Sequence, residues 1–223
     1  MNRRQATNVE SRMKRAIASL FTAGLLAGCS AFGIRSDIEQ PAYEVIDSPA
    51  ETLEVRRYAP RVAAEATVEA EATEDGRNAA FRLLFDYISG ANREAAKIAM
   101  TAPVETAEPG QEIAMTVPVE TVESAGGQTR MRFFLPATYS RVTPPAPTDS
   151  RVRIVTLPEQ TLAVLRFSGS RSEERIEAKS ETLLAALRAT DWRPTAEPVA
   201  QLYDPPWTLP FFRRNEVAVA VTR

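Results

Sequence analysis

The chain has 223 residues, of which 44% are hydrophobic and 25% charged, as in ordinary globular proteins. Its formal net charge is −2, but residues 1–28 hold five basic residues and one acidic residue, so residues 29–223 carry −6. An acidic body disfavours nucleic acid as a partner, and a chain with no histidine and one cysteine has no disulfide framework and no zinc site of the usual Cys/His kind.

The N-terminal region predicts a signal peptide. Lys14 and Arg15 precede an apolar run, residues 16–28, that is too short to span a bilayer but has the length of a signal-peptide core. The run ends in LAGC, residues 26–29, which resembles a bacterial lipobox, the signal in which the cysteine becomes the first mature residue and carries lipid. The alternative is an uncleaved anchor or a buried helix with an incidental cysteine.

We therefore expect a signal peptide over residues 1–28, a tether over 29–41 and one folded domain over 42–223. Lipidation of Cys29 would anchor the chain to a membrane of the bacterial cell envelope. Ser30, in place of an aspartate, resembles the sorting signal for the outer membrane, which predicts a domain that faces the periplasm. Met13 is an alternative to Met1 as the translation start.

The folded region contains an internal duplication. Residues 45–58 align with residues 154–167 at an offset of 109, and both stretches are β-rich runs broken by a proline turn. An amphipathic helix follows each stretch, one over about 76–89 and one that begins at Ser170 with a capping-box pattern to Glu173 and ends before Pro194. Further strands are expected over 98–122, 131–135, 199–203 and 216–221. Two halves, about 42–140 and 150–223, would pair about a pseudo-two-fold axis with the helices outside.

A short repeat lies within the first half. IAMTAPVETAE, residues 98–108, returns as IAMTVPVETVE, residues 113–123, around a Pro109-Gly110 turn. Two copies around one turn favour a β-hairpin over a repeat array. Pro103 and Pro118 predict edge or bulged strands. The alternation predicts Met100 and Met115 in the core, and Glu105 and Glu120 toward solvent.

With these blocks in place, the chain resembles the SOUL haem-binding family. The resemblance rests on four blocks. They are KIAMTAPVE (residues 97–105) with its second copy IAMTVPVE (residues 113–120), RMRFFLPATY (residues 130–139), the PPAP loop, and YDPPWTLPFFRRNEVAVAV (residues 203–221). The resemblance covers residues 43–221. It implies an α+β fold in which two pseudo-symmetric βαβ-type halves form a distorted eight-stranded antiparallel β-barrel flanked by two helices.

The resemblance also implies binding of haem or another porphyrin in a shallow apolar groove. Transferred to this chain, the groove lies between the first helix and the loop before the last strand. Aromatic side chains would stack on the macrocycle, and an arginine would pair with a propionate. The implied binding residues are Phe81, Leu84, Phe85, Trp207, Thr208, Leu209, Phe211, Phe212 and Arg213.

Histidine ligation of iron is excluded because the chain has no histidine. Tyrosine, or more weakly methionine, could hold the iron instead, and Tyr203 is the weak candidate. Each implied site residue also has a structural explanation: the helix residues could serve the core, and Arg213 could be a solvated strand start. The loop aromatics are harder to bury.

An enzyme is disfavoured, because the sequence has no histidine base, no spare thiol, no G-x-S-x-G and no phosphate loop. The leading interpretation is a lipid-anchored tetrapyrrole-binding protein. The alternative is a structural or partner-binding envelope lipoprotein that keeps the fold without haem binding. The oligomeric state is left open.

Overall fold

The computed structural model describes residues 38–69, 74–93, 110–124, 128–140 and 143–223. Cys29, the predicted signal peptide and the first copy of the repeat lie outside these residues. Within them, no helix is both long enough and apolar enough to cross a membrane. The elements are β1 (Tyr43–Ala50), β2 (Leu53–Tyr58), β3 (Arg61–Val68), α2 (Glu74–Ile88), β4 (Asn92–Arg93), β5 (Val119–Ser124), β6 (Gln128–Phe134), η1 (Ala137–Ser140), β7 (Ala146–Pro147), β8 (Val152–Leu157), β9 (Gln160–Phe167), α3 (Glu173–Leu187), β10 (Arg193–Pro194), β11 (Val199–Leu202), η2 (Pro210–Phe212) and β12 (Asn215–Thr222).

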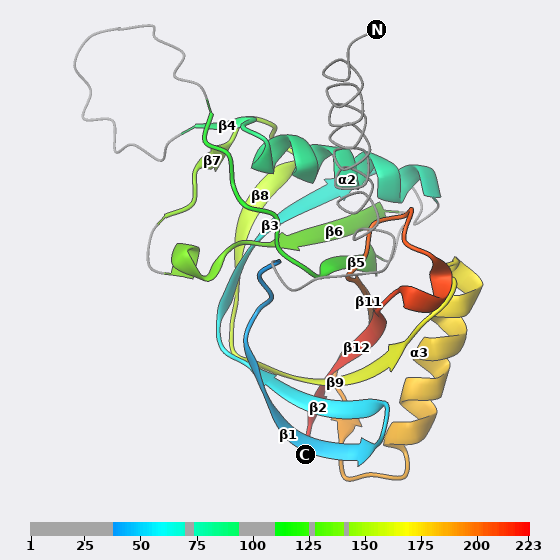
Figure 1. Ribbon diagram of the computed structural model, residues 1–223. Coiled ribbons are helices and arrows are strands. Elements are labelled where there is room, and N and C mark those ends of the chain that lie inside the picture. Colours follow the sequence, from blue (N-terminus) through cyan, green and yellow to red (C-terminus); the bar gives the residue numbers. More distant parts are fainter. Residues whose placement is uncertain (1–37, 70–73, 94–109, 125–127, 141–142) are drawn as a thin grey trace, which may run out of the picture.

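One antiparallel sheet dominates the fold. Its strands follow the order β1-β2-β9-β12-β11-β5-β6-β3-β8, and β10 pairs beside β12. The sheet curls into a half-barrel, with α2 across one end and α3 along the other (Figure 1). The predicted α+β class and its two flanking helices are confirmed. The run from β2 to β8 supplies eight strands, and β1 extends it at one edge.

The two halves repeat at an offset of 99 residues. This offset carries Leu53 of β2 to Val152 of β8, Arg61 of β3 to Gln160 of β9, and Glu74 of α2 to Glu173 of α3, with equal element lengths each time. The offset of 109 inferred from sequence is therefore wrong. It matched the hairpin β1–β2 to the hairpin β8–β9, whose structural counterpart is β2–β3.

The halves exchange their first strands. β2 pairs with β9 of the second half, and β8 pairs with β3 of the first. The two registers are reciprocal, since Leu53 faces Leu165 just as Val152 faces Ala66. Each half thus completes the sheet of the other, which joins both halves in one sheet with a separate hydrophobic cluster under each helix.

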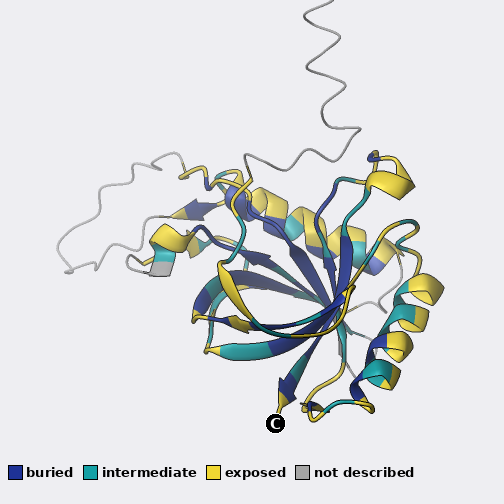
Figure 2. Cartoon of the chain, turned by 60° about the horizontal axis from the view of Figure 1, so that its bottom comes forward, coloured by how far each residue is buried: buried dark blue, intermediate teal, exposed yellow. Residues whose placement is uncertain are grey.

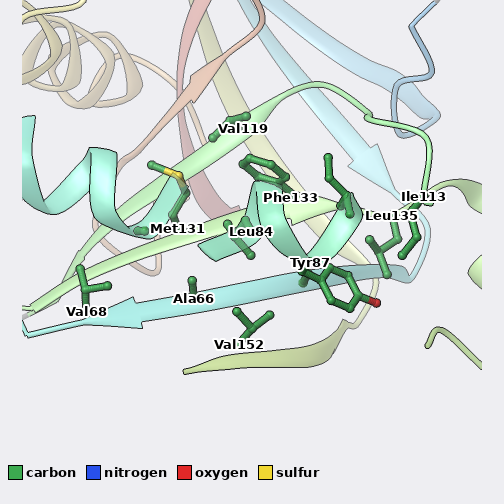
Figure 3. Packing of buried hydrophobic residues seen from close by; sticks show 13 residues of the cluster. Ala66, Val68, Leu84, Tyr87, Ile113, Val119, Met131, Phe133, Leu135 and Val152 are labelled. Atoms are coloured by element: carbon green, nitrogen blue, oxygen red, sulfur yellow. The ribbon is translucent and has the colours of Figure 1, made fainter. Parts of the chain in front are cut away.

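Both helices pack on the same face of the sheet. Leu84 and Tyr87 of α2 point into a cluster with Ala66, Phe133 and Val152 (Figure 3). Leu183 and Leu187 of α3 pack on strands β2, β9 and β12. The outer sides of both helices stay exposed, while the strands are largely buried (Figure 2). This is the arrangement expected of helices with one apolar stripe.

Helix boundaries differ slightly from expectation. α3 begins at Glu173 after Ser172, and no side-chain hydrogen bond caps it. The predicted capping box does not form, because the Ser170 hydroxyl accepts from the Ser172 amide outside the helix. α2 ends at Ile88, and Gly90 adopts a φ of +114°, a conformation that glycine reaches without steric cost.

The second copy of the repeat is not half of a simple hairpin. Only its end is a strand, β5, and residues 119–121 of β5 are paired on both sides, with β6 and β11. Pro118 precedes the strand, so it removes no hydrogen bond from the ladder, and β5 lies inside the sheet rather than at an edge. Met115 is exposed and Glu120 is buried, both opposite to expectation.

The face of the sheet away from the helices carries a row of polar side chains beside a small apolar cluster of Tyr58, Leu162, Val164 and Ala218. Cross-strand partners share a face, and one row of them crosses seven adjacent strands. The row runs Arg166, Glu216, Gln201, Glu120, Arg132, Glu65, Arg153. The three glutamates of this row are buried, and each accepts a hydrogen bond from at least one arginine.

Candidate functional site

An exposed pair of aromatic side chains lies on α2. Phe81 and Phe85, one turn apart, are 36% and 47% exposed. Their ring centroids lie 6.1 Å apart at an interplanar angle of 14°, so the two rings are nearly parallel. Phe81 also meets Phe133 of the sheet edge-on, which fixes its position. Leu84, the third residue implied on this helix, is fully buried beneath the pair and belongs to the core.

A second aromatic group lies on the loop between β11 and β12. Trp207 and Phe211 are 68% and 66% exposed, and Leu209 and Phe212 are also exposed. The rings of Phe211 and Phe212 are 4.5 Å apart. Together these side chains form an apolar surface of the kind that marks contact with a ligand or partner.

The backbone of this loop is held by hydrogen bonds. The Arg213 guanidinium donates to the carbonyls of Thr208 and Pro206, each at 2.7 Å. The Gly169 amide donates to the carbonyl of Pro210 at 2.8 Å. Thr208 is fully buried and supports the loop from below. Arg213, implied as a propionate partner, therefore uses two of its three nitrogens to fix the loop, which presents its aromatic side chains on a preorganised frame.

Arg171 lies beside the start of the β11–β12 loop. Its guanidinium donates to the carbonyl of Asp204 at the start of the loop. Burial and the charges of Arg213 and Arg77 lower its pKa, while Glu74 acts in the opposite direction. Arg77 and Glu74 lie in the first turns of α2, so the charges at that helix end act on Arg171. The same proximity is visible in Figure 1, where the β11–β12 loop lies at the end of α2 that follows β3.

Arg171 was missed by the sequence analysis. The capping-box pattern predicts a helix that begins at Ser170 and therefore includes Arg171. In the structure Arg171 lies in the loop before α3, which begins at Glu173. The usable signal was Ser172-Glu173, an N-cap residue followed by acidic residues, which places residues 170–172 before the helix.

Tyr203, the weak candidate for an iron ligand, is unsuited to that role. Its side chain is buried, and its hydroxyl donates to Glu216 at 2.7 Å. Burial, followed by the charge of Glu216, raises its pKa, so the phenol stays protonated. Tyr87 likewise donates to the carbonyl of Pro145. Within the described residues, no group of three or more acidic or thiol side chains could hold a metal ion.

The aromatic surface is open rather than enclosed. Of the hollows in the described part of the chain, one lies at the start of α3, around Ser172 and Arg175, and another lies beneath Gln40 and Pro41 on the helix-free face. Neither is lined by Phe81, Phe85 or the aromatic residues of the β11–β12 loop. A ligand at the aromatic surface would therefore lie against it, with one side toward solvent.

Both aromatic groups occur where the halves differ. At the offset of 99, Phe81 and Phe85 correspond to Ser180 and Leu184 of α3. The β11–β12 connection covers residues 203–214, whereas its counterpart between β5 and β6 covers only 125–127. The fold is built twice, but the aromatic surface occurs once.

Comparison with known proteins then decides the family. The sequence model of the family described as "SOUL heme-binding protein" matches residues 38–220. The chain belongs to the SOUL haem-binding family. It is similar to human heme-binding protein 2, with 30% identity over 138 residues, and to the mouse protein of that name, with 28% identity over 155 residues. These matches cover 61% and 68% of this chain, and 62% and 70% of the relatives.

Solved structures support the fold alone. An uncharacterized conserved protein from Listeria innocua matches with a TM-score of 0.51 and 12% identity, covering 78% of this chain and 94% of the other. The EcmrR C-terminal domain matches with a TM-score of 0.50 and 11% identity, covering 81% and 98%. At these identities the likeness concerns the SOUL-type architecture and carries no statement about a ligand.

Proposed function

We propose that this SOUL-family chain binds haem or a related tetrapyrrole on the open surface formed by Phe81, Phe85 and the loop residues Trp207, Phe211 and Phe212. The observation that carries the proposal is that these aromatic residues are exposed and occur only where the two halves depart from their shared pattern. Packing of the duplicated fold does not require them, since α3 does without them.

The chemistry of a porphyrin suits this surface. Its flat π face would stack on the nearly parallel rings of α2 and on the loop aromatics. Its propionates would pair with Arg171, which lies beside the start of the loop and carries an incompletely solvated positive charge. Ligation of iron by histidine is impossible in this chain, so we expect stacking and charge to supply the affinity, with the iron contributing its own redox and ligand chemistry when present.

A titration of the full-length chain tests the proposal. Haemin and metal-free protoporphyrin are added, and the Soret band and the fluorescence of Trp207 are followed. We expect saturable binding of both porphyrins. Trp207→Ala and Phe211→Ala should each weaken it about tenfold, in line with the loss of an aromatic contact of about 1 kcal/mol or more.

The matched control is Met115→Ala, which removes an exposed apolar side chain outside the proposed surface. It should leave both titrations unchanged. Equal weakening by the control, or no saturable binding by the unmodified chain, would reject tetrapyrrole binding. A flat titration together with loss of a protein contact in Trp207→Ala would instead support the partner-binding lipoprotein.

The anchoring of the chain is a separate proposal. The lipobox-like sequence that ends at Cys29 supports lipidation and a place in the bacterial envelope, with the binding domain in the periplasm. Fractionation tests it: Cys29→Ser should move the chain from the membrane fraction to the soluble fraction, and unchanged partition would reject it.

A further inference from the structure

A narrow crevice lies on the helix-free face of the sheet, the opposite face from the one that carries α2. With residues 38–41 in place it is too narrow to admit a water molecule, so a ligand needs that segment to move. Three tyrosines and two prolines form much of its wall, and three polar side chains form the rest. The lining residues are Gln40, Pro41, Tyr43, Tyr58, Arg61, Pro118, Gln201 and Tyr203.

Arg61, which lines the crevice, is a buried cation without an ion pair among the described residues. It is 8% exposed, yet among the described residues no carboxylate lies within ion-pair distance of it. Its guanidinium lies 4.2 Å from the ring centre of Tyr58 and 4.8 Å from that of Phe134. One nitrogen donates to Gln160 at 2.6 Å, but Nε is buried with no partner.

Other arginines of this face show what Arg61 lacks. Arg56 and Arg214 both bind Glu216, at 2.8 and 2.7 Å, and Arg132 binds Glu120, also at 2.8 Å. A buried cation without a counter-ion costs stability, and a buried donor without an acceptor adds to that cost. Burial lowers the pKa of Arg61 and the charge of Glu120 opposes this, but Glu120 makes no ion pair with Arg61, so Arg61 still lacks a direct carboxylate partner.

Gln201 supplies an acceptor in the same crevice. Its side chain is 1% exposed and lies in the polar row between Glu120 and Glu216. Its amide nitrogen donates to Glu120 at 3.1 Å, while Oε1 is buried with no partner. The crevice thus contains one unmatched donor on a cation and one unmatched acceptor, between aromatic walls.

We propose that this crevice is a second ligand site, which takes a small aromatic carboxylate that also carries a hydrogen-bond donor. The carboxylate pairs with Arg61, the donor group faces Oε1 of Gln201, and the ring packs against the tyrosines and prolines. The site is separate from the tetrapyrrole surface and does not depend on it.

Entry to the crevice requires movement of residues 38–41. This short segment covers the crevice with Gln40 and Pro41. Hydrogen bonds hold it, from the Val117 amide to the Glu39 carbonyl at 3.1 Å, from the Ala137 amide to the Glu39 carboxylate at 2.6 Å and from Arg214 to Gln40 Oε1 at 3.1 Å. A ligand that enters the crevice must displace these bonds, and their free energy is part of the cost of binding.

Calorimetric titration of the full-length chain with 4-aminobenzoate tests the site. We expect saturable binding, at least tenfold weaker with the neutral analogue 4-aminobenzamide and at least tenfold weaker in Arg61→Met. Arg166→Met, which removes an exposed arginine of the same sheet, should bind as the unmodified chain does. Gln40→Ala, which removes the hydrogen bond between Arg214 and the covering segment, should bind 4-aminobenzoate several-fold more tightly.

These outcomes separate the alternatives. Absence of saturable binding in both the unmodified chain and Gln40→Ala overturns the proposal, as does equal affinity for the amide. If Arg61→Met does not fold, the amide and Gln40→Ala decide the matter. Trp207→Ala should leave 4-aminobenzoate binding unchanged, so failure of either site leaves the other standing.

Discussion

The two halves of the molecule share a skeleton and differ at their surfaces. Leu84 and Ile88 of α2 correspond to Leu183 and Leu187 of α3, and all four are buried. The exposed Phe81, one turn before Leu84, corresponds to Ser180. The buried positions therefore keep their apolar character in both halves, whereas the exposed position of Phe81 is polar in the second half. The comparison separates what the fold requires from what only one half offers.

The strongest test of the shared skeleton removes the equivalent leucines. Leu84→Ala and Leu183→Ala each delete a side chain with no exposed area, so each should lower the free energy of unfolding by about 2–5 kcal/mol. Denaturant unfolding measures both. The equivalence predicts similar losses. A loss under 1 kcal/mol in one helix alone would show that the halves do not share a packing scheme.

On the helix-free face, replacing Glu216 should lower the free energy of unfolding more than replacing Glu65. Glu216 accepts from Arg56, Arg214 and Tyr203, and both Glu216 and Arg56 are buried. Glu216→Gln leaves Arg214 without its carboxylate partner and Arg56 with Glu54 alone, and should cost about 3 kcal/mol of unfolding free energy. Glu65→Gln should cost less, because its partner Arg153 is 64% exposed and can turn to water, and its other close partner, Arg132, keeps its ion pair with Glu120. Equal losses would contradict this ranking.

The same two glutamates predict an acid-sensitive fold. Burial would raise the pKa of Glu216, but hydrogen bonds and charge from Arg56 and Arg214 outweigh it, so the pKa falls below its ordinary 4.5. For Glu65, burial is likewise outweighed by hydrogen bonds from Arg153 and Arg132. A lowered folded-state pKa stabilises the fold above pH 4.5, and this contribution is lost as pH falls through the folded-state value.

Unfolding measured from pH 7 down to pH 3 checks this sign. The free energy of unfolding should stay level to about pH 5 and fall below pH 4.5. Glu216→Gln should begin lower and fall less steeply, because one of the titrating groups is gone. A profile of the variant parallel to that of the unmodified chain would show that Glu216 does not titrate on unfolding.

The sequence was most informative where its signals were local. The apolar stripe of α2 and the proline-flanked aromatics of residues 205–212 predicted the helix and an exposed loop. The offset of 109 is wrong because successive strands with alternating residues resemble one another. A shift by one strand and its turn therefore preserves the pattern. Aligning the two helices instead gives 99. Burial of Glu120 and the setting of Arg61 depend on partners from distant strands, which no local pattern predicts.

Giving α2 the residues that α3 has at the same positions tests whether the two phenylalanines of α2 belong to the binding surface. The double variant Phe81→Ser and Phe85→Leu gives α2 the outward residues of α3. It should weaken haemin binding about tenfold, a change of about 1.4 kcal/mol, and alter stability less than Leu84→Ala does. Haemin titration and denaturant unfolding together measure both. Unchanged affinity would show that the α2 pair is not part of the binding surface.

The smallest expected effect concerns an exposed position where the halves also differ. Arg57 corresponds to Thr156, and its ion pair with Glu44, at 3.2 Å, joins side chains that are 49% and 68% exposed. Exposed pairs of this kind contribute about 0–1 kcal/mol, so Arg57→Thr should lower the unfolding free energy by less than about 0.5 kcal/mol and leave haemin binding unchanged. Weaker haemin binding in this variant would mean that any outward difference between the halves affects the ligand. The expected result instead restricts binding to those differences that expose aromatic side chains.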